Sequence, residues 1–406
     1  MRVMKMKDNW DKTFTKATEV LSIIEENGYE AYFVGGCVRD YLLDRPVQDI
    51  DIASSALPEE VMTLFDHVIP VGIDHGTVIV RYKKTSYEVT TFRHDGTYTD
   101  QRHPDHVTYV RSINDDLQRR DFTINAIAMN RHGEIIDLFS GRKDLKNQII
   151  RTVGNANDRL TEDPLRILRG IRFTSQLGFA LEENTYVEMK QLKDSIETVA
   201  IERVTDELEK LFKGEFIQTG ITYLVELELH FYIPIWKDNP SLLNKLPKHL
   251  SPFVSFAEVI TLFHYLDPTI SISTWSKAWK CSNKTKHTAL QLMRAIDYYL
   301  EHGIDHWLVY ILPKEAQTSF QHFVFLIFEE KIDSAIVQYY EQLPITNRNQ
   351  LNIDGHDLQQ LFRNRKRGKW IREYIEKIEY EIVMGRLLNT KKAIKEWILC
   401  HLPDKN

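Results

Sequence analysis

The chain has 406 residues, of which 43% are hydrophobic and 27% charged, and its formal net charge at pH 7 is −6. This length exceeds one ordinary hydrophobic core, so we expect two to four domains. No apolar run approaches the ~20 residues of a membrane-spanning helix, and the N-terminal segment lacks the apolar core of a secretory signal. The three cysteines are far apart in sequence, which suits a reducing compartment and gives no zinc-binding spacing. These features predict a cytoplasmic protein that does not enter the membrane.

The negative net charge argues against a protein that binds nucleic acid over its whole surface. An RNA-binding face remains open, because local groups of basic residues decide such contacts. Three segments supply these groups: Arg119 with Arg120, the run from Arg166 to Arg172, and residues 363–369.

Residues 1–150 mix helix and strand patterns. Apolar stripes at helical spacing predict helices, and β-branched alternation between turn residues predicts strands. In chain order we expect a helix over 12–26, a strand over 31–36, a helix from Val38, a strand over 49–53, a helix over 58–65, and strands over 78–82 and 87–92. The polar segment 93–107 that follows is long for a connection, and loops of that length are usually functional or mobile.

From Asp158 onward the pattern becomes helical. Residues 201–212 place apolar side chains at helical spacing between charged ones, and residues 370–388 repeat this pattern. We therefore predict an α+β protein with a mixed α/β catalytic head over 1–150, then an all-α neck over 151–215, a body over 216–320 and a tail over 321–406.

Asp49 and Asp51 are the most informative pair in the head. Residues two apart on a strand project from the same face, so the two carboxylates aim at one point. Paired carboxylates suit hard divalent cations such as Mg²⁺, and two metals can activate a hydroxyl and neutralise a leaving pyrophosphate. Glu88 is a candidate third carboxylate, although an outward-facing strand position is the simpler explanation for it.

Upstream of this pair, a strand ending in Gly35 and Gly36 turns into a helix that carries Arg39. Backbone N–H groups at a helix start attract phosphate, and an arginine in the first turn opposes the helix dipole unless an anion lies nearby. A glycine pair is also an ordinary turn, so this signal is weak alone. Followed so closely by two carboxylates, it indicates a nucleotidyl-transfer site at which an RNA 3′-hydroxyl attacks.

The segment 117–129 adds positive charge beside further polar groups. Adjacent arginines such as Arg119 and Arg120 are most often solvated, but a triphosphate requires fixed positive charge, which arginine supplies well. Asp121 and Asn125 are candidates for reading sugar hydroxyls. The apolar residues of this segment are expected to form a buried helical face: Ile124, Ile127 and Ala128.

Asp163 precedes Pro164, which is an ordinary helix start with aspartate as the N-cap. A functional alternative follows from hydrogen-bond chemistry, because aspartate only accepts and arginine only donates. Cytosine and adenine present an amino donor beside a ring-nitrogen acceptor, whereas uracil and guanine present the inverse. Asp163 with Arg166 would thus admit C and A, and each buried mismatch would cost about 1–3 kcal/mol. The protein would then take the place of a template.

Together these motifs resemble those of the bacterial-type (class II) CCA-adding enzymes, or tRNA nucleotidyltransferases, of the polymerase-β-like nucleotidyltransferase superfamily. Residues 351–362 resemble the C-terminal region of that family more loosely. Over the first 215 residues the order and spacing match in GGCVRD (35–40), DID (49–51), GIDHGT (72–77), RRDFTINA (119–126), EDPLRILRGIRF (162–173) and IERVTDELEKLF (201–212).

The resemblance implies an enzyme that adds C, C and A in turn to tRNA 3′ ends from CTP and ATP, without a nucleic-acid template. It implies that Asp49 and Asp51 are catalytic and hold Mg²⁺, and that tRNA lies along the helical part. Arg203 would brace the base-selecting helix, and the loop 93–107 would switch addition from C to A. The implied nucleotide contacts are Gly36, Arg39, Arg120, Asp163, Arg166, Arg169 and Arg172. The oligomeric state, monomer or homodimer, is left open.

Three other functions compete with this interpretation. A bacterial poly(A) polymerase would share the head, but a long basic C-terminal extension is not seen. A metal-dependent phosphohydrolase would use the pairs His94-Asp95 and His356-Asp357, although no convincing set of further ligands accompanies either pair. A non-catalytic tRNA-binding scaffold would leave the carboxylate pair unexplained.

Overall fold

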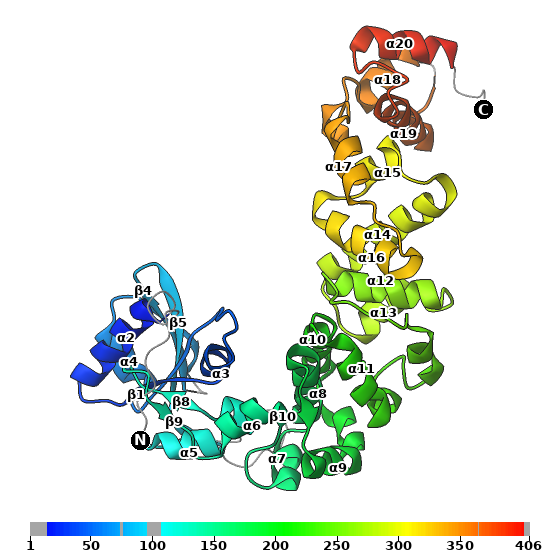
Figure 1. Cartoon of the computed structure of the whole chain (residues 1–406). Coiled ribbons are helices and arrows are strands. Elements are labelled where there is room, and N and C mark those ends of the chain that lie inside the picture. The colour runs from blue at the N-terminus through cyan, green and yellow to red at the C-terminus, as the bar shows by residue number, and fades with distance from the viewer. Residues whose placement is uncertain (1–13, 74–75, 96–106, 364, 402–406) are drawn as a thin grey trace. The chain divides into compact units, whose positions relative to one another are not determined.

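The computed structural model describes residues 14–73, 76–95, 107–363 and 365–401 (Figure 1). The chain divides into two compact units, Met1–Leu243 and Asn244–Asn406. Within the described ranges, no helix has both the length and the apolar character needed to cross a membrane.

The head in the first unit is built on a seven-stranded mixed sheet, which confirms the predicted α+β class. Only β2 and β5 run parallel among the neighbouring pairs of this sheet in the described chain. The strand order is β3 (Val68–Gly72), β4 (Thr77–Tyr82), β5 (Thr85–Thr91), β2 (Asp51–Ser54), β1 (Ala31–Val34), β8 (Ala128–Met129) and β9 (Ile135–Ile136). This order places Asp51 between Val34 of β1 and Glu88 of β5, its two register partners.

Helices and short elements complete the head. The expected amphipathic helix is α2 (Thr15–Glu26), which packs with α4 (Pro58–Leu64) beside the sheet (Figure 1). Strands β6 (Arg93–Asp95) and β7 (Val107–Tyr109) pair at the two ends of the polar segment, whose interior lies outside the described residues. The other elements are α3 (Gly36–Leu42), α5 (Ile113–Gln118), η2 (Thr123–Asn125), α6 (Gly141–Asn147) and β10 (Ile149–Ile150).

The prediction that Ile124, Ile127 and Ala128 form one buried helical face is wrong. Ile124 lies in the 3₁₀ turn η2, and Ala128 lies in β8, which pairs with β1. All three side chains are nevertheless fully buried. A short apolar run does not distinguish a buried strand from a buried helix. Here the end of the run pairs with the edge of β1 and therefore forms a strand.

The helical part of the first unit is centred on α8 (Leu165–Leu177), which packs against α10 (Ile201–Phe212) and α11 (Ile217–Glu226). Helix α10 has the bounds that its periodic pattern predicts. Nearly every residue of α8 is buried, including Arg166 and Arg172. The remaining elements are α7 (Ala156–Glu162), β11 (Ala180–Leu181), α9 (Glu183–Gln191), η3 (Lys193–Thr198) and η4 (Leu229–Tyr232).

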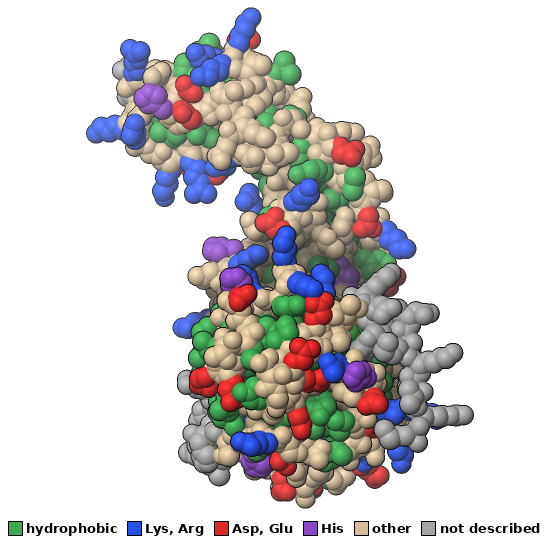
Figure 2. Space-filling model, turned by 90° about the vertical axis from the view of Figure 1, so that its left-hand side faces the viewer, with side chains coloured by type: hydrophobic (Ala, Val, Ile, Leu, Met, Phe, Trp, Pro, Cys, Tyr) green, Lys and Arg blue, Asp and Glu red, His purple; other side chains and the backbone are tan. Residues whose placement is uncertain are grey.

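The second unit is all-helical within its described residues. The rings of Phe263, Trp275 and Trp279 pack together in its core, and a hydrophobic cluster near the C-terminus includes Ile378 and Ile382. Figure 2 shows lysine and arginine side chains gathered on the visible face of the C-terminal part. The helices are α12 (Phe256–Leu266), α13 (Ile272–Ala278), α14 (Asn283–His302), α15 (His306–Ile311), α16 (Gln317–Phe328), α17 (Asp333–Glu341), α18 (Gly355–Leu361), α19 (Lys369–Val383) and α20 (Lys391–Cys400), with 3₁₀ turns η5 (Pro240–Lys245) at the junction of the units, η6 (Lys314–Ala316) and η7 (Arg348–Gln350).

Candidate active site

The acidic pair lies at the start of β2. Asp51 is the first residue of the strand and Asp49 precedes it, so the strand begins two residues later than its pattern suggests. Asp51 is half-buried and Asp49 exposed, whereas Ile52 is fully buried. Burial is the main cause that raises the pKa of Asp51; Arg120 lowers this pKa, and the negative charge of Asp49 raises it. The negative charge of Asp49 therefore acts on Asp51, and a bound cation would offset this effect.

Glu88 lies beside Asp51 on the neighbouring strand β5. Glu88 as a whole is exposed. Partial burial of its carboxyl, and then the charge of Asp51, raise the pKa of Glu88, while Arg93 lowers it. Across the described residues, no three or more His, Cys, Asp or Glu side chains come together as a metal-binding group. Mg²⁺ commonly uses only one or two carboxylates, with substrate phosphates and waters as its other ligands. Asp49 and Asp51 fit that type of site.

The turn between β1 and α3 depends on Gly35. This residue has φ +71° and ψ −134° at the N-terminal cap of α3, a conformation that residues with a Cβ rarely adopt. A Cβ at Gly35 would lie 3.1 Å from Arg120 Nη1 and 3.8 Å from Asp51 Oδ2. A Cβ at Gly36 would meet only Arg39 Nη2, at 3.7 Å. The backbone thus requires glycine at position 35, a distinction that the sequence did not give.

Arg39 is fixed from three sides. Its Nε and Nη2 donate to the two carboxylate oxygens of Asp40 at 2.9 and 3.0 Å, and its Nη1 donates to Asn125 Oδ1 at 2.8 Å. The guanidinium also lies 5.2 Å from the centre of the Phe173 ring on α8. Asp40, to which the sequence assigned no direct role, therefore orients Arg39.

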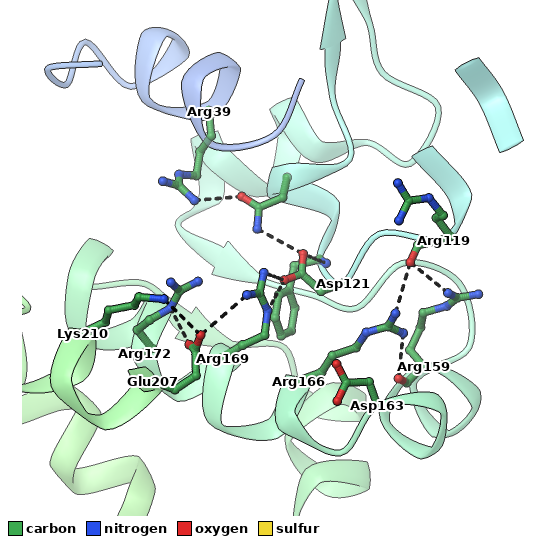
Figure 3. Close-up of polar contacts among 12 residues, drawn as sticks. Arg39, Arg119, Asp121, Arg159, Asp163, Arg166, Arg169, Arg172, Glu207 and Lys210 are labelled. Carbon is green, nitrogen blue, oxygen red and sulfur yellow. Dashed lines mark hydrogen bonds and ion pairs between the residues drawn. The ribbon is translucent and has the colours of Figure 1, made fainter. Parts of the chain in front are cut away.

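A hydrogen-bond chain continues from Arg39 into the neck (Figure 3). Asn125 Nδ2 donates to Asp121 Oδ1 at 3.1 Å, and Asp121 Oδ2 accepts from Arg169 Nε at 2.9 Å and Nη2 at 2.5 Å. Burial alone would raise the pKa of Asp121, but the Arg169 guanidinium holds that pKa well below its ordinary value. Asp121 and Asn125 thus connect α3 of the head with α8 of the neck, and their expected contacts with sugar hydroxyls stay a prediction.

Glu207 on α10 joins the arginines of α8 (Figure 3). Its carboxylate lies 3.7 Å from Arg169 Nη1 and 3.0 Å from Arg172 Nε, the latter an ion pair without hydrogen-bond geometry. Glu207 is only 4% exposed, and burial is the main cause that lowers the pKa of Arg172 to about 10, against the opposing effect of Glu207. The sequence analysis missed Glu207. The available signal was its place on the apolar stripe of 201–212, where a charged side chain needs a partner.

Asp163 and Arg166 do not contact each other directly through their side chains. Asp163 accepts from Arg203 Nη2 at 2.9 Å, which is the expected brace, and from the Leu165 backbone N–H at 3.2 Å. Helix α8 begins at Leu165 with Pro164 in the cap position, so Asp163 lies one residue before the cap position predicted for it.

Arg166 is 7% exposed and donates to three other groups. These are the carbonyl of Arg159 at 2.9 Å, Glu162 Oε2 at 2.8 Å and the carbonyl of Arg119 at 3.3 Å. A guanidinium has five N–H donors, so these three contacts do not exhaust it. The structure places Asp163 and Arg166 near each other at the start of α8 (Figure 3) without joining them.

The His-Asp pairs do not form a second site within the described residues. His94 is exposed on β6. His356 and Asp357 open α18, where the Asp357 carboxylate accepts the Asp354 N–H as part of a capping box. Helix capping thus accounts for Asp357, and the phosphohydrolase hypothesis has no assembled ligand set in the described chain.

Comparison with known proteins supports the nucleotidyltransferase interpretation. Residues 31–151 match the poly(A) polymerase head domain, 178–238 a probable RNA- and SrmB-binding site of polymerase A, and 255–398 a putative domain 2 of tRNA nucleotidyltransferase. The chain is 50% identical over 395 residues to the CCA-adding enzyme of Oceanobacillus iheyensis, covering 97% of this chain and 99% of that one. It is 40% identical over 403 residues to the CCA-adding enzyme of Anoxybacillus flavithermus, covering 98% and 99%.

The fold, like the sequence, is similar to that of a CCA-adding enzyme. The chain matches the crystal structure of the Bacillus stearothermophilus CCA-adding enzyme in complex with CTP, with a TM-score of 0.85, 34% identity and 98% of each chain covered. These relatives favour the CCA-adding interpretation over the poly(A) polymerase alternative. The chain is a nucleotidyltransferase that belongs to the family of CCA-adding enzymes.

Proposed function

We propose that this protein adds C, C and A in turn to the 3′ ends of tRNAs that lack them, using CTP and ATP and releasing pyrophosphate. The observation that carries the proposal is the meeting of Gly35, Asp51 and Arg120 where β1 turns into α3. The turn proposed to bind phosphate thus lies beside Asp51, one member of the proposed metal-binding pair. The CCA-adding relatives, one of them with bound CTP, give the reaction its substrates.

Asp49 and Asp51 are the residues that would hold Mg²⁺. A bound metal there would lower the pKa of the attacking 3′-hydroxyl and neutralise charge on the pyrophosphate. Arg39 and Arg120 would donate to the triphosphate, and the small Gly36 would let it approach the start of α3. Asp40 and Asn125 keep Arg39 in its orientation.

The start of α8 would choose the base. Asp163 offers acceptors and Arg166 offers donors, the pattern that C and A match and that U and G oppose. Arg203 holds the Asp163 carboxylate, so the acceptor is presented in one orientation. Two backbone carbonyls and the Glu162 carboxylate hold Arg166, and nucleotide binding would redirect one of its donors. Arg169 and Arg172 would complete the nucleotide site.

The rest of the chain would bind tRNA. One enzyme must serve every tRNA, so the contacts are expected to be mainly to phosphates and to the shape of the molecule. Exposed basic residues near the C-terminus suit this use: Arg363, Lys366, Arg367, Lys369, Lys391, Lys392 and Lys395. We retain the division into a head, neck, body and tail at residues 150, 215 and 320, the loop 93–107 as the element that switches from C to A, and a cytoplasmic location, all as parts of the proposal.

Extension of a tRNA that lacks its last three nucleotides tests this function. CTP alone should add two nucleotides, ATP alone none, and both together CCA and no more. Asp49→Ala and Asp51→Ala should abolish addition, while Glu59→Gln, at an exposed head position, should not. Unlimited addition of A without C would establish the poly(A) polymerase, and phosphate release without extension the phosphohydrolase.

A further inference from the structure

Asp116, near the end of α5, is buried and binds two arginines. Its Oδ1 accepts from Arg119 Nε at 3.0 Å and Nη2 at 2.7 Å, and its Oδ2 accepts from Arg120 Nε at 3.3 Å and Nη2 at 2.9 Å. The Asp116 side chain is 1% exposed, against 16% and 18% for the two arginines. Both carboxylate oxygens therefore serve to hold guanidinium groups, and we call these three residues the arginine fork.

The arginine fork leaves one group of Arg120 directed at the active site. Asp116 engages Nε and Nη2, whereas Nη1 lies 3.1 Å from the position that a Cβ would take at Gly35. Arg120 also acts electrostatically on Asp51, whose pKa it lowers against the effect of burial. The group that Asp116 does not use is therefore the one nearest the proposed phosphate-binding turn.

At neutral pH the Asp116 carboxylate is ionised and stays bound to both arginines of the arginine fork. Burial alone would raise the pKa of Asp116, but Arg120 and Arg119 together hold that pKa below its ordinary value. The carboxylate is thus ionised and bound on both sides. A long side chain that is already fixed loses less conformational freedom when it binds a ligand.

We infer that Asp116 is a positioning residue, which holds Arg120 so that Nη1 donates to the triphosphate of the incoming nucleotide. The inference rests on the proposed function. Two guanidinium charges and one carboxylate leave a net charge of +1, so Asp116 reduces the local attraction for phosphate while it fixes the donor. Attraction by charge alone and positioning therefore predict opposite effects when the carboxylate is removed.

The test is binding of inorganic tripolyphosphate, CTP and ATP to the full-length protein, measured by calorimetry in wild type and Asp116→Asn. Positioning predicts that all three ligands bind about 10-fold more weakly, because a long side chain that is no longer held in place must be ordered on binding. Stronger or unchanged binding by folded Asp116→Asn would overturn the inference. Unequal losses for CTP and ATP would also contradict it, because Arg120 is assigned to the phosphates and not to the base.

Two control variants separate positioning from charge and from burial. Asp115→Asn makes the same charge change at the adjacent, exposed position of α5, and should not weaken binding. Asp144 is 3% exposed and binds Thr123 and Arg151, so Asp144→Asn should lower the unfolding temperature while nucleotide affinity stays within twofold of wild type. In steady-state extension, Asp116→Asn should raise KM for both nucleotides with kcat nearly unchanged, whereas partial unfolding would lower kcat alone.

A double-mutant comparison tests whether Asp116 acts through Arg120. Asp116→Asn should weaken tripolyphosphate binding in the wild type but have no further effect in Arg120→Gln; a full second loss would contradict the inference. If Asp116→Asn does not fold, Asp116→Glu provides a second test. Its longer side chain displaces the two guanidinium groups, so this variant should bind tripolyphosphate more weakly than wild type. Wild-type affinity in Asp116→Glu would refute positioning. Failure of the proposed function is distinguishable, since wild type itself would then not add CCA to the trimmed tRNA.

Discussion

Replacement of Gly35 by alanine should destabilise the head and disturb the site together. At φ +71° and ψ −134°, an alanine is strained by about 1–3 kcal/mol. The new Cβ would also lie 3.1 Å from Arg120 Nη1, a tight contact that requires the guanidinium to move by a few tenths of an ångström. In a unit of this size, each kcal/mol lowers the unfolding temperature by about 2–4 °C, so a loss of about 2 kcal/mol corresponds to about 4–8 °C.

The neighbouring glycine provides the matched control for stability. Gly36 is the first residue of α3, and its Cβ would make only an ordinary 3.7 Å contact with Arg39. Alanine is favoured over glycine within a helix by about 0.5–1 kcal/mol, so Gly36→Ala should leave stability unchanged or raise it. Thermal unfolding of the full-length variants, followed by calorimetry, measures the difference. If Gly35→Ala unfolds at the same temperature as Gly36→Ala, the backbone requirement at position 35 is refuted.

Two further predictions concern the start of α8 and the chain that joins it to the head. Asp163→Ala should increase incorporation of UTP and GTP more than it weakens metal binding, and unchanged rejection of both nucleotides would count against base selection by this residue. The folded pKa of Asp121 is lowered, so its stabilisation is present above the ordinary aspartate pKa of about 3.9 and is lost as pH falls through the folded value. Asp121→Asn should therefore lower the free energy of unfolding by about 3–5 kcal/mol at pH 7. Denaturant titrations should show that this loss becomes smaller below about pH 4. A loss that does not depend on pH would exclude the ionised Asp121–Arg169 pair as its cause.

Local patterns predicted most of the fold. Helix α10 has its predicted bounds, and α2 and the central strands occur where expected, because an apolar periodicity is a property of a few consecutive residues. The segment around η2 and β8 was misassigned, since its apolar run is too short to distinguish a helix from a strand and the choice depends on the edge of β1.

Chemistry and spacing along the chain single out Asp49, Asp51 and Arg39 as candidate site residues, and their roles stay a prediction. The partner of Arg169 and Arg172, Glu207, belongs to another helix, and no spacing along the chain reveals which helix packs against α8. The arginine fork could have been predicted from the sequence. Asp116 precedes its two arginines by three and four residues, the separation at which helical side chains meet.

Mn²⁺ binding in the presence of CTP, followed by electron paramagnetic resonance, tests most directly whether Asp49 and Asp51 hold the metal. Asp49→Asn and Asp51→Asn should each weaken Mn²⁺ binding by at least about 10-fold, because each removes one of the two carboxylates assigned to the ion. Glu88→Gln, at the adjacent position of β5, should weaken it less. Wild-type Mn²⁺ affinity in both aspartate variants would contradict the assignment of Asp49 and Asp51 as the metal site.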